Sequence, residues 1–216
     1  MIIVRYADDF IVGFQHETDA RRFLEEMRAR LEEFALALHP EKTRLIEFGR
    51  YAAENRKRRG LGKPETFNIL GFTFICGKSR RGKFLIKRKT RRDRMRAKLQ
   101  AIKQEMRRRM HQSVQAQGKW LNRVVSGYFN YHAVPTNRRA LVAFRDTVAR
   151  GWLRVLRRRS QRDTVTWERM RVLVETRLPR PLILHPWPNQ RFAVTHPRWE
   201  PYAGKPHVRL CAGGAQ

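Results

Sequence analysis

Two adjacent aspartates, Asp8 and Asp9, are the residues whose type and spacing most directly suggest chemistry. Two carboxylates this close repel each other unless a cation lies beside them. Mg²⁺ takes one or two carboxylates together with phosphate oxygens, and this pair can supply them. Two such ions about 3.5–4 Å apart could activate a 3′-hydroxyl and stabilise a leaving pyrophosphate. The dipeptide by itself favours a plainer interpretation, an ordinary turn, because Asp is common in turns.

The aspartates lie between two runs of β-branched and aromatic residues, 2–6 and 10–14. Such runs with a short polar break predict a tight β-hairpin with the aspartates at its tip. A helix capped by Thr18 or Asp19 should follow, because apolar residues recur there every three or four positions. They are Phe23, Met27, Leu31 and Phe34, and Pro40 should end the region.

The next segments are also expected to be mostly strand and loop. Residues 43–48 are expected to form a strand, and residues 50–66, basic and poor in large apolar groups, a loop. Residues 67–76 and 84–87 have the composition of two strands of a second hairpin, joined by the glycine-containing turn 77–82.

After Thr90 the apolar period changes from two to about 3.6, which predicts helices. The first should carry an apolar stripe, and a second is expected around 120–132, broken by Pro135. Asn137 should cap a third helix and Thr166 a short fourth one. The apolar positions expected on these helices are Met95, Leu99, Ile102, Met106 and Met110; Trp120, Val124, Tyr128 and Tyr131 or His132; Leu141, Phe144, Val148, Trp152 and Val155; and Trp167, Met170 and Val174. Prolines recur from Pro179 onward, so the end of the chain should be irregular.

The charge of the chain is large and unevenly distributed. The 216 residues carry a formal net charge of +29. Residues 1–50 hold 8 Lys and Arg against 10 Asp and Glu, so the remainder holds 40 against 9. A field of this size repels itself unless something anionic is bound, and nucleic acid is the expected partner.

Other classes of protein are disfavoured by composition. Cys76 and Cys211 are too few for a disulfide framework or a cysteine-based zinc site. No apolar run approaches the roughly 20 residues that a membrane span needs, so no membrane partner is expected. We expect a cytoplasmic protein associated with nucleic acid.

The flanks of the aspartate pair decide between catalysis and an ordinary turn. Tyr6-Ala7-Asp8-Asp9 and its apolar flanks resemble the YADD hairpin of reverse transcriptases over ten residues. Further matches follow in chain order, and together they are similar to a bacterial group II intron-encoded reverse transcriptase/maturase. Residues 39–44 resemble the Lys-Thr segment after the palm helix, and 69–74 the LGF strand that supports the primer end. Residues 120–132 resemble the maturase-specific domain X, and 185–214 the ends of short members that lack a zinc-finger endonuclease domain.

The resemblance implies roles for residues near the hairpin. Asp8 and Asp9 would be catalytic residues that bind Mg²⁺, and Tyr6 would lie near the incoming nucleotide. Lys42 would lie near the palm site and Leu70, Gly71 and Phe72 under the primer. Plainer interpretations stay open, since Lys42 could be a solvated lysine and Gly71 could permit a bend between core residues. Tyr128 and Tyr131 are expected to face the core.

The basic surplus predicts phosphate contacts on the helical part. Each contact that neutralises a phosphate adds roughly 0.7–0.9 to the salt dependence of binding. Blocks of like charge are usually solvent-exposed helix faces without a binding role. Here the large excess of Lys and Arg over Asp and Glu favours contact with RNA phosphates. The expected RNA-binding residues are Arg107, Arg108, Arg109, Lys119, Arg138, Arg139, Arg157, Arg158 and Arg159.

The expected fold is therefore α+β. Residues 1–88 should form the C-terminal part of a reverse-transcriptase palm, 89–178 a basic all-helical thumb and maturase domain, and 179–216 a Pro-rich irregular tail. Family members carry fingers, most of the palm and another metal-binding aspartate before the hairpin, so the chain is expected to be a truncated form. We expect no primer extension by this chain alone.

Three hypotheses for function remain at this point. The first is an RNA-directed DNA polymerase and maturase of a mobile group II intron, acting on intron RNA and an RNA/DNA template-primer in a bacterial cytoplasm. The second is a maturase remnant that binds intron RNA without chemistry. The third, another YADD retroelement such as a retron, is disfavoured by the long segment that resembles domain X.

Overall fold

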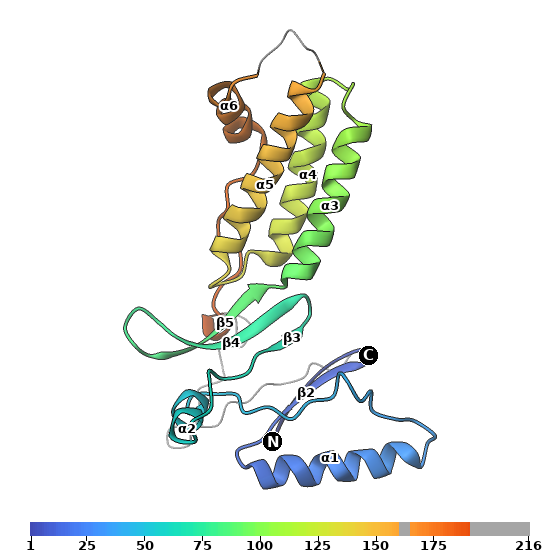
Figure 1. Ribbon diagram of the computed structural model, residues 1–216, viewed down its shortest axis with the longest axis vertical. Coiled ribbons are helices and arrows are strands. Elements are labelled where there is room, and N and C mark those ends of the chain that lie inside the picture. Colours follow the sequence, from blue (N-terminus) through green and yellow to red (C-terminus); the bar gives the residue numbers. More distant parts are fainter. Residues whose placement is uncertain (160–164, 191–216) are drawn as a thin grey trace. The chain divides into compact units, whose positions relative to one another are not determined.

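The computed structural model describes residues 1–159 and 165–190 and is α+β (Figure 1). It divides after Phe48 into two compact units, each described by itself. Unit 1 comprises residues 1–48, and unit 2 begins at Gly49. The irregular tail predicted from residue 179 is described only to residue 190, where residues 179–187 form no regular element. Cys211 and the end of that tail lie outside the described residues.

Unit 1 contains the predicted hairpin and helix. Strands β1 (Ile2–Tyr6) and β2 (Asp9–Gly13) pair antiparallel with Tyr6 opposite Asp9, which leaves Ala7 and Asp8 as a two-residue turn. Helix α1 (Glu17–Glu32) follows. The ring centroid of Phe14, just after β2, lies 5.3 Å from that of Phe23 on α1.

Two details of unit 1 were predicted wrongly. The N-cap of α1 is His16, whose side chain makes no capping hydrogen bond, so Thr18 and Asp19 lie inside the first turn. Glu17 and Asp19 instead place negative charge where the helix dipole favours it. Residues 43–48 form no strand. A strand needs a hydrogen-bonded neighbour, and none of the described strands pairs with this segment.

Unit 2 begins with a short helix, α2 (Ala52–Arg58), where the sequence predicted only a loop. Alanine, glutamate and the basic residues of this segment are good helix formers. Glu54 in the first turn and the basic residues in the last turn also match the helix dipole. The prediction was wrong because it relied on the absence of large apolar residues.

The sheet of unit 2 has the order β3 (Phe67–Ile69), β4 (Phe72–Lys78) and β5 (Phe84–Thr90). The single strand predicted over 67–76 is instead a tight hairpin. Leu70 and Gly71 both have positive φ, +49° and +73°, and occupy its two-residue turn. Two consecutive positive φ values match the twist of antiparallel strands, and Gly at the second position adopts them easily. Leucine at the first position is not typical of such a turn, so the sequence did not predict the turn.

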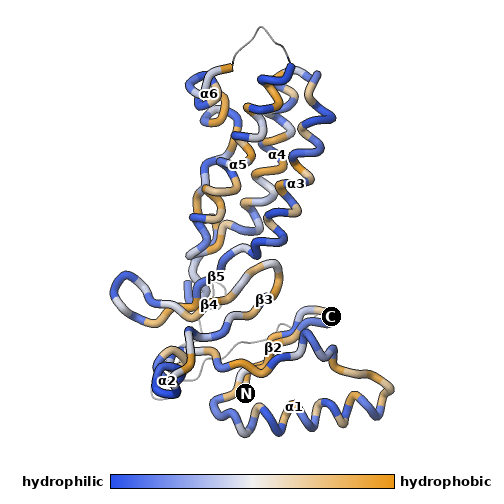
Figure 2. The backbone as a smooth tube through the Cα atoms, viewed as in Figure 1, coloured by the Kyte–Doolittle hydropathy of each residue, from blue (hydrophilic) through white to orange (hydrophobic). Residues whose placement is uncertain are grey.

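Three long helices form the body of unit 2: α3 (Arg92–Arg108), α4 (Val114–His132) and α5 (Arg138–Arg157), with the shorter α6 (Trp167–Arg177) beside α4 and α5 (Figure 1). All four helices were predicted. Hydrophobic and hydrophilic stretches alternate along the three long helices, as expected of amphipathic helices (Figure 2).

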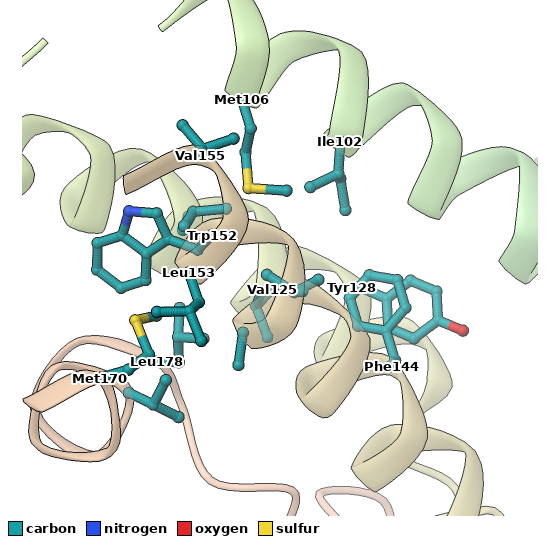
Figure 3. Packing of buried hydrophobic residues seen from close by; sticks show 14 of the residues in the cluster. Ile102, Met106, Val125, Tyr128, Phe144, Trp152, Leu153, Val155, Met170 and Leu178 are labelled. Carbon is teal, nitrogen blue, oxygen red and sulfur yellow. The ribbon is translucent and has the colours of Figure 1, made fainter. Parts of the chain in front are cut away.

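The core of unit 2 contains most of the predicted apolar stripes (Figure 3). On α4, however, the fully buried residues are Leu121 and Val125, one position after the predicted Trp120 and Val124, and Trp167 is 41% exposed. Trp152, Phe144 and Met170 are fully buried, and the Phe144 ring stacks on Tyr128 with centroids 3.6 Å apart. Tyr128 faces this core as predicted, but the prediction for Tyr131 was wrong, since it is 52% exposed. Thr166 caps α6 by accepting a hydrogen bond from the Arg169 amide. Asn137 precedes α5, but its side chain makes no capping bond.

A buried glutamine, Gln117 of α4, links α4 to the segment that follows α3 and to α5. Its Nε2 lies 3.0–3.1 Å from the carbonyl oxygens of Arg109, Met110 and Gln112, where α3 turns toward α4. Its Oε1 accepts a hydrogen bond of 2.8 Å from Nε1 of Trp152 on α5. A polar side chain in this position hydrogen-bonds to the carbonyl oxygens of Met110 and Gln112, just after the end of α3, where the backbone supplies no helical partner.

None of the helices in the described part of the chain combines the length and apolar character needed to cross a membrane.

Candidate metal-binding hairpin and basic helices

The Asp8–Asp9 pair lies at the exposed tip of the β1–β2 hairpin. Asp8 occupies the turn and Asp9 begins β2, one residue earlier than predicted. Tyr6, opposite Asp9, is 62% exposed, so it shares with Asp9 a sheet face open to solvent. Neither carboxylate forms an ion pair with another described residue.

The turn itself is held in an unusual backbone conformation. Ala7 has φ of +50°, which non-glycine residues rarely adopt. Arg5 Nε donates a hydrogen bond of 3.1 Å to the Ala7 carbonyl oxygen and so supports the turn. Strained turns of this kind often occur where side chains must be presented for binding or catalysis.

Two carboxylates on one tip fit Mg²⁺ in part. Mg²⁺ usually keeps several waters and uses one or two protein carboxylates with substrate phosphates. The described residues contain no group of three or more His, Cys, Asp or Glu side chains that could hold a metal ion. The hairpin therefore suits an ion that is also coordinated by phosphate oxygens of a bound ligand. Its two carboxylates alone do not complete the coordination of Mg²⁺.

The other predicted site residues fall in both units. Lys42 is exposed in a turn of unit 1, the unit that also holds the aspartates. Leu70, Gly71 and Phe72 belong to unit 2, at the β3–β4 turn. Phe72 is 7% exposed and Leu70 40%, so the turn presents Leu70 and buries Phe72.

The Leu70–Gly71 turn is held by residues that sequence reasoning did not single out for this role. The Tyr131 hydroxyl donates a hydrogen bond of 2.8 Å to the Leu70 carbonyl oxygen. The Phe72 ring lies 5.6 Å from Tyr131 and 5.2 Å from His132, centroid to centroid. These contacts join residues 60 or so positions apart, and no local spacing signals them.

Burial holds His132 neutral at this junction. Loss of solvation lowers the pKa of His132 from its usual 6.5 to about 4. In the unfolded chain the imidazole binds a proton below pH 6.5, whereas in the folded chain it does so only near pH 4. The unfolded state therefore binds more protons in that window, and stability falls as the pH falls through it.

We expect the free energy of unfolding to decrease by at most about 1.4 kcal/mol per pH unit between pH 6.5 and 4 through this residue. Urea unfolding at several pH values measures the slope. His132→Asn should flatten the slope over that window, which separates His132 from the carboxylates. Equal slopes in the two proteins would show that His132 is not the group that titrates.

Most of the predicted RNA-binding residues gather at one end of the bundle. The C-terminal ends of α3 and α5 and the first two turns of α4 meet at the end remote from the sheet (Figure 1). We call the basic residues there the distal basic cluster: Arg107, Arg108, Arg109, Lys119, Arg157, Arg158 and Arg159. Cations at helix C-termini also stabilise the helices, so part of this charge serves the fold.

The members of the distal basic cluster differ in whether their side chains already have partners within the protein. Arg109 Nε lies 2.7 Å from Glu105, and its guanidinium lies 5.1 Å from the Trp120 ring centroid. Arg157 Nε donates to the Val165 carbonyl oxygen at 2.9 Å. Arg107, Lys119 and Arg158 are exposed and form no ion pair with another described residue. These three are the better candidates for phosphate contact.

Arg138 and Arg139 lie at the other end of α5. With Arg80 of the β4–β5 loop and Arg150, they line a hollow of about 550 Å³ that also contains Asp146. Four arginines against one aspartate make this hollow suitable for an anion such as a phosphate group.

Comparison with known families bears on the first third of the chain. Residues 1–74 match the family model described as "Reverse transcriptase (RNA-dependent DNA polymerase)". The matched segment contains the Asp8–Asp9 hairpin and the Leu70–Gly71 turn. No curated protein matches the chain. The helices after residue 74 lie outside the matched segment.

Proposed function

We propose that this chain acts in RNA-directed DNA synthesis as part of a group II intron reverse transcriptase/maturase. The observation that carries the proposal is the exposed, unpaired Asp8–Asp9 tip, which lies within the segment that matches the reverse-transcriptase model. Asp8 and Asp9 are assigned to bind Mg²⁺ at the growing end of the new strand. When bound, the ion would lower the barrier to nucleotidyl transfer by stabilising charge on the reacting oxygens.

The chain's own residues would position the reactants. Tyr6 shares the open hairpin face with Asp9 and is assigned to the incoming nucleotide. Lys42, in the same unit, is assigned to the palm site. The Leu70–Gly71 turn is assigned to the primer end. α3–α6 are assigned to the thumb and domain X, and their exposed arginines and lysines to template-primer and intron RNA.

Metal binding tests the proposal without requiring polymerase activity. Mn²⁺ replaces Mg²⁺ and is followed by its electron paramagnetic resonance signal, which weakens on binding. We expect weak binding to the chain alone and tighter binding when a primer–template and a nucleoside triphosphate supply phosphate oxygens. Changing Asp8→Asn and Asp9→Asn together should weaken binding at least about tenfold, because both charged ligands are lost.

A matched control is available in the same unit. Glu25→Gln with Glu32→Gln removes the same charge from exposed positions on α1, outside the hairpin. This variant should bind Mn²⁺ like the unchanged chain. Equal losses in the two variants, or no loss in either, would contradict a metal site at the hairpin.

A second function is supported by the charge of unit 2. An intron RNA-binding maturase remnant needs only the basic helices α3–α6 and no metal site. This alternative would be favoured if RNA binding depends on the basic residues of α3–α5 and Mn²⁺ binding is unchanged when Asp8 and Asp9 are replaced. A different YADD retroelement would bind Mn²⁺ at the hairpin but show no preference for intron RNA.

A further inference from the structure

The connection between α4 and α5 takes the place of a neighbouring strand at the free edge of β5. Thr136 Oγ1 accepts a hydrogen bond of 2.9 Å from the Arg88 amide and donates one of 3.1 Å to the Arg88 carbonyl oxygen. Asn137 Oδ1 accepts one of 3.0 Å from the Thr90 amide. These backbone groups face away from β4, so side chains of the connection satisfy an edge that would otherwise be open.

The connection is itself strained and closely fixed. Thr136 has φ of +76°, a rare conformation for a β-branched residue that persists only where the surroundings enforce it. Asn137 is 1% exposed, and its Nδ2 donates to Thr90 Oγ1 at 2.7 Å and to the His132 carbonyl oxygen at 2.8 Å. One amide therefore joins the end of α4, the start of α5 and the end of β5.

The Leu70–Gly71 turn is held at Leu70 by the end of α4 and at Gly71 by the residue that follows β5. Tyr131 binds the Leu70 carbonyl oxygen, and the amide of Arg91, just after β5, donates to the Gly71 carbonyl oxygen at 3.0 Å. The Phe72 ring stacks on Tyr131. The turn is thus tied to the same short region that Thr136 and Asn137 fix to β5.

We propose that the end of α4 and the α4–α5 connection form a positioning device for the Leu70–Gly71 turn, with Tyr131 as its positioning residue. The inference rests on the proposed function, in which this turn lies at the primer end. α4 and α5 also carry exposed basic residues, so the helices assigned to the duplex also set the place of the turn. Tyr131 should therefore affect where the primer end lies and leave the affinity for the duplex unchanged.

Tyr131→Phe tests the device, because it removes one hydroxyl from a half-exposed ring and leaves the stacking on Phe72. The first readout is amide hydrogen exchange at Ile69 and Phe72, the pair that closes the β3–β4 hairpin. Loss of one hydrogen bond should speed their exchange about fivefold. Tyr51→Phe is the matched control and should leave exchange unchanged, because Tyr51 is an exposed tyrosine at the start of α2 that forms no hydrogen bond with the turn.

The second readout is photocrosslinking from a reactive nucleotide at the 3′ end of the primer in a primer–template duplex. The unchanged chain should crosslink at residues 70–72. Tyr131→Phe should lower that yield severalfold while the dissociation constant for the duplex changes less than about twofold. Tyr51→Phe should change neither quantity.

The two readouts separate the possible failures. Unchanged exchange in Tyr131→Phe would overturn the positioning device itself. Faster exchange with an unchanged crosslink would show that the bond exists but does not position the primer end, which also overturns the inference. A primer that crosslinks only elsewhere in the unchanged chain would overturn the assigned place of the primer, and with it the proposed function of the turn.

Discussion

Replacing Gln117 with leucine should lower the free energy of unfolding by about 3–5 kcal/mol. Gln117 is 3% exposed and makes hydrogen bonds with three backbone carbonyl oxygens and with Nε1 of Trp152. Leucine has nearly the same size but offers no donor or acceptor. The buried indole N–H and the part-buried carbonyl oxygens of Met110 and Gln112 would then lose their partner, and each buried group left unsatisfied costs about 1–3 kcal/mol.

Denaturant unfolding followed by tryptophan fluorescence and circular dichroism measures this effect. Gln115→Leu is the matched control, because Gln115 is exposed on the same helix and its replacement should change stability by less than about 0.5 kcal/mol. Trp152→Phe combined with Gln117→Leu removes both partners of one bond. The double variant should therefore be less destabilised than the sum of the single variants. A loss below about 1 kcal/mol in Gln117→Leu would contradict the assigned role.

Gln117 illustrates which parts of the fold can be predicted from sequence. The stripes Ile102, Met106 and Phe144, Val148, Trp152 repeat at helical spacing, and the structure buries them as predicted. Periodicity reports which face of a helix is buried. It cannot report a buried glutamine, because the partners that stabilise Gln117 are carbonyl groups of another segment and an indole 35 positions away.

The errors in the strands have a related cause. The β-branched runs around Asp8 and Asp9 predicted the first hairpin correctly, because an obvious polar break separates them. The β3–β4 turn contains no such break, since Leu70 is apolar and only Gly71 indicates a turn. Residues 43–48 have a strand-like composition, but a strand also depends on a partner that local sequence does not reveal.

The residues of the candidate site also differ in whether the sequence alone could identify them. The Asp8–Asp9 pair could be identified from spacing and flanking residues alone. The residues that hold the Leu70–Gly71 turn could not, because Tyr131, Asn137 and Thr90 meet only through contacts between segments about 45–60 positions apart. Blocks of arginine were also too coarse a signal, since Arg109 and Arg157 are occupied by contacts within the protein.

The largest expected effect on binding comes from the three free members of the distal basic cluster together with Arg159, which is also exposed. Changing Arg107, Lys119, Arg158 and Arg159 to glutamine should weaken binding to structured RNA or a primer–template by about a hundredfold or more near 0.1 M salt. The physical reason is counterion release, since each lost phosphate contact removes roughly 0.7–0.9 from the slope of log affinity against log salt. Arg109 is left in place because it packs over Trp120.

The control for this experiment removes the same charge elsewhere. Changing Arg21, Arg22, Arg28 and Arg30 on α1 to glutamine lowers the net charge equally. Three of these arginines form exposed ion pairs with glutamates, so their loss should cost little stability. A general effect of net charge would weaken binding in both variants, whereas a local surface would weaken it only in the distal variant.

The most direct test of RNA binding by the basic helices is therefore the affinity of the chain for structured intron RNA across a salt series, measured beside these two variants. We expect tight binding with a steep salt dependence for the unchanged chain, a slope lower by roughly 3 in the distal variant, and an unchanged slope in the α1 variant. Weak binding by the unchanged chain, or equal slopes in all three proteins, would contradict the claim that the helices of unit 2 are a nucleic-acid-binding surface.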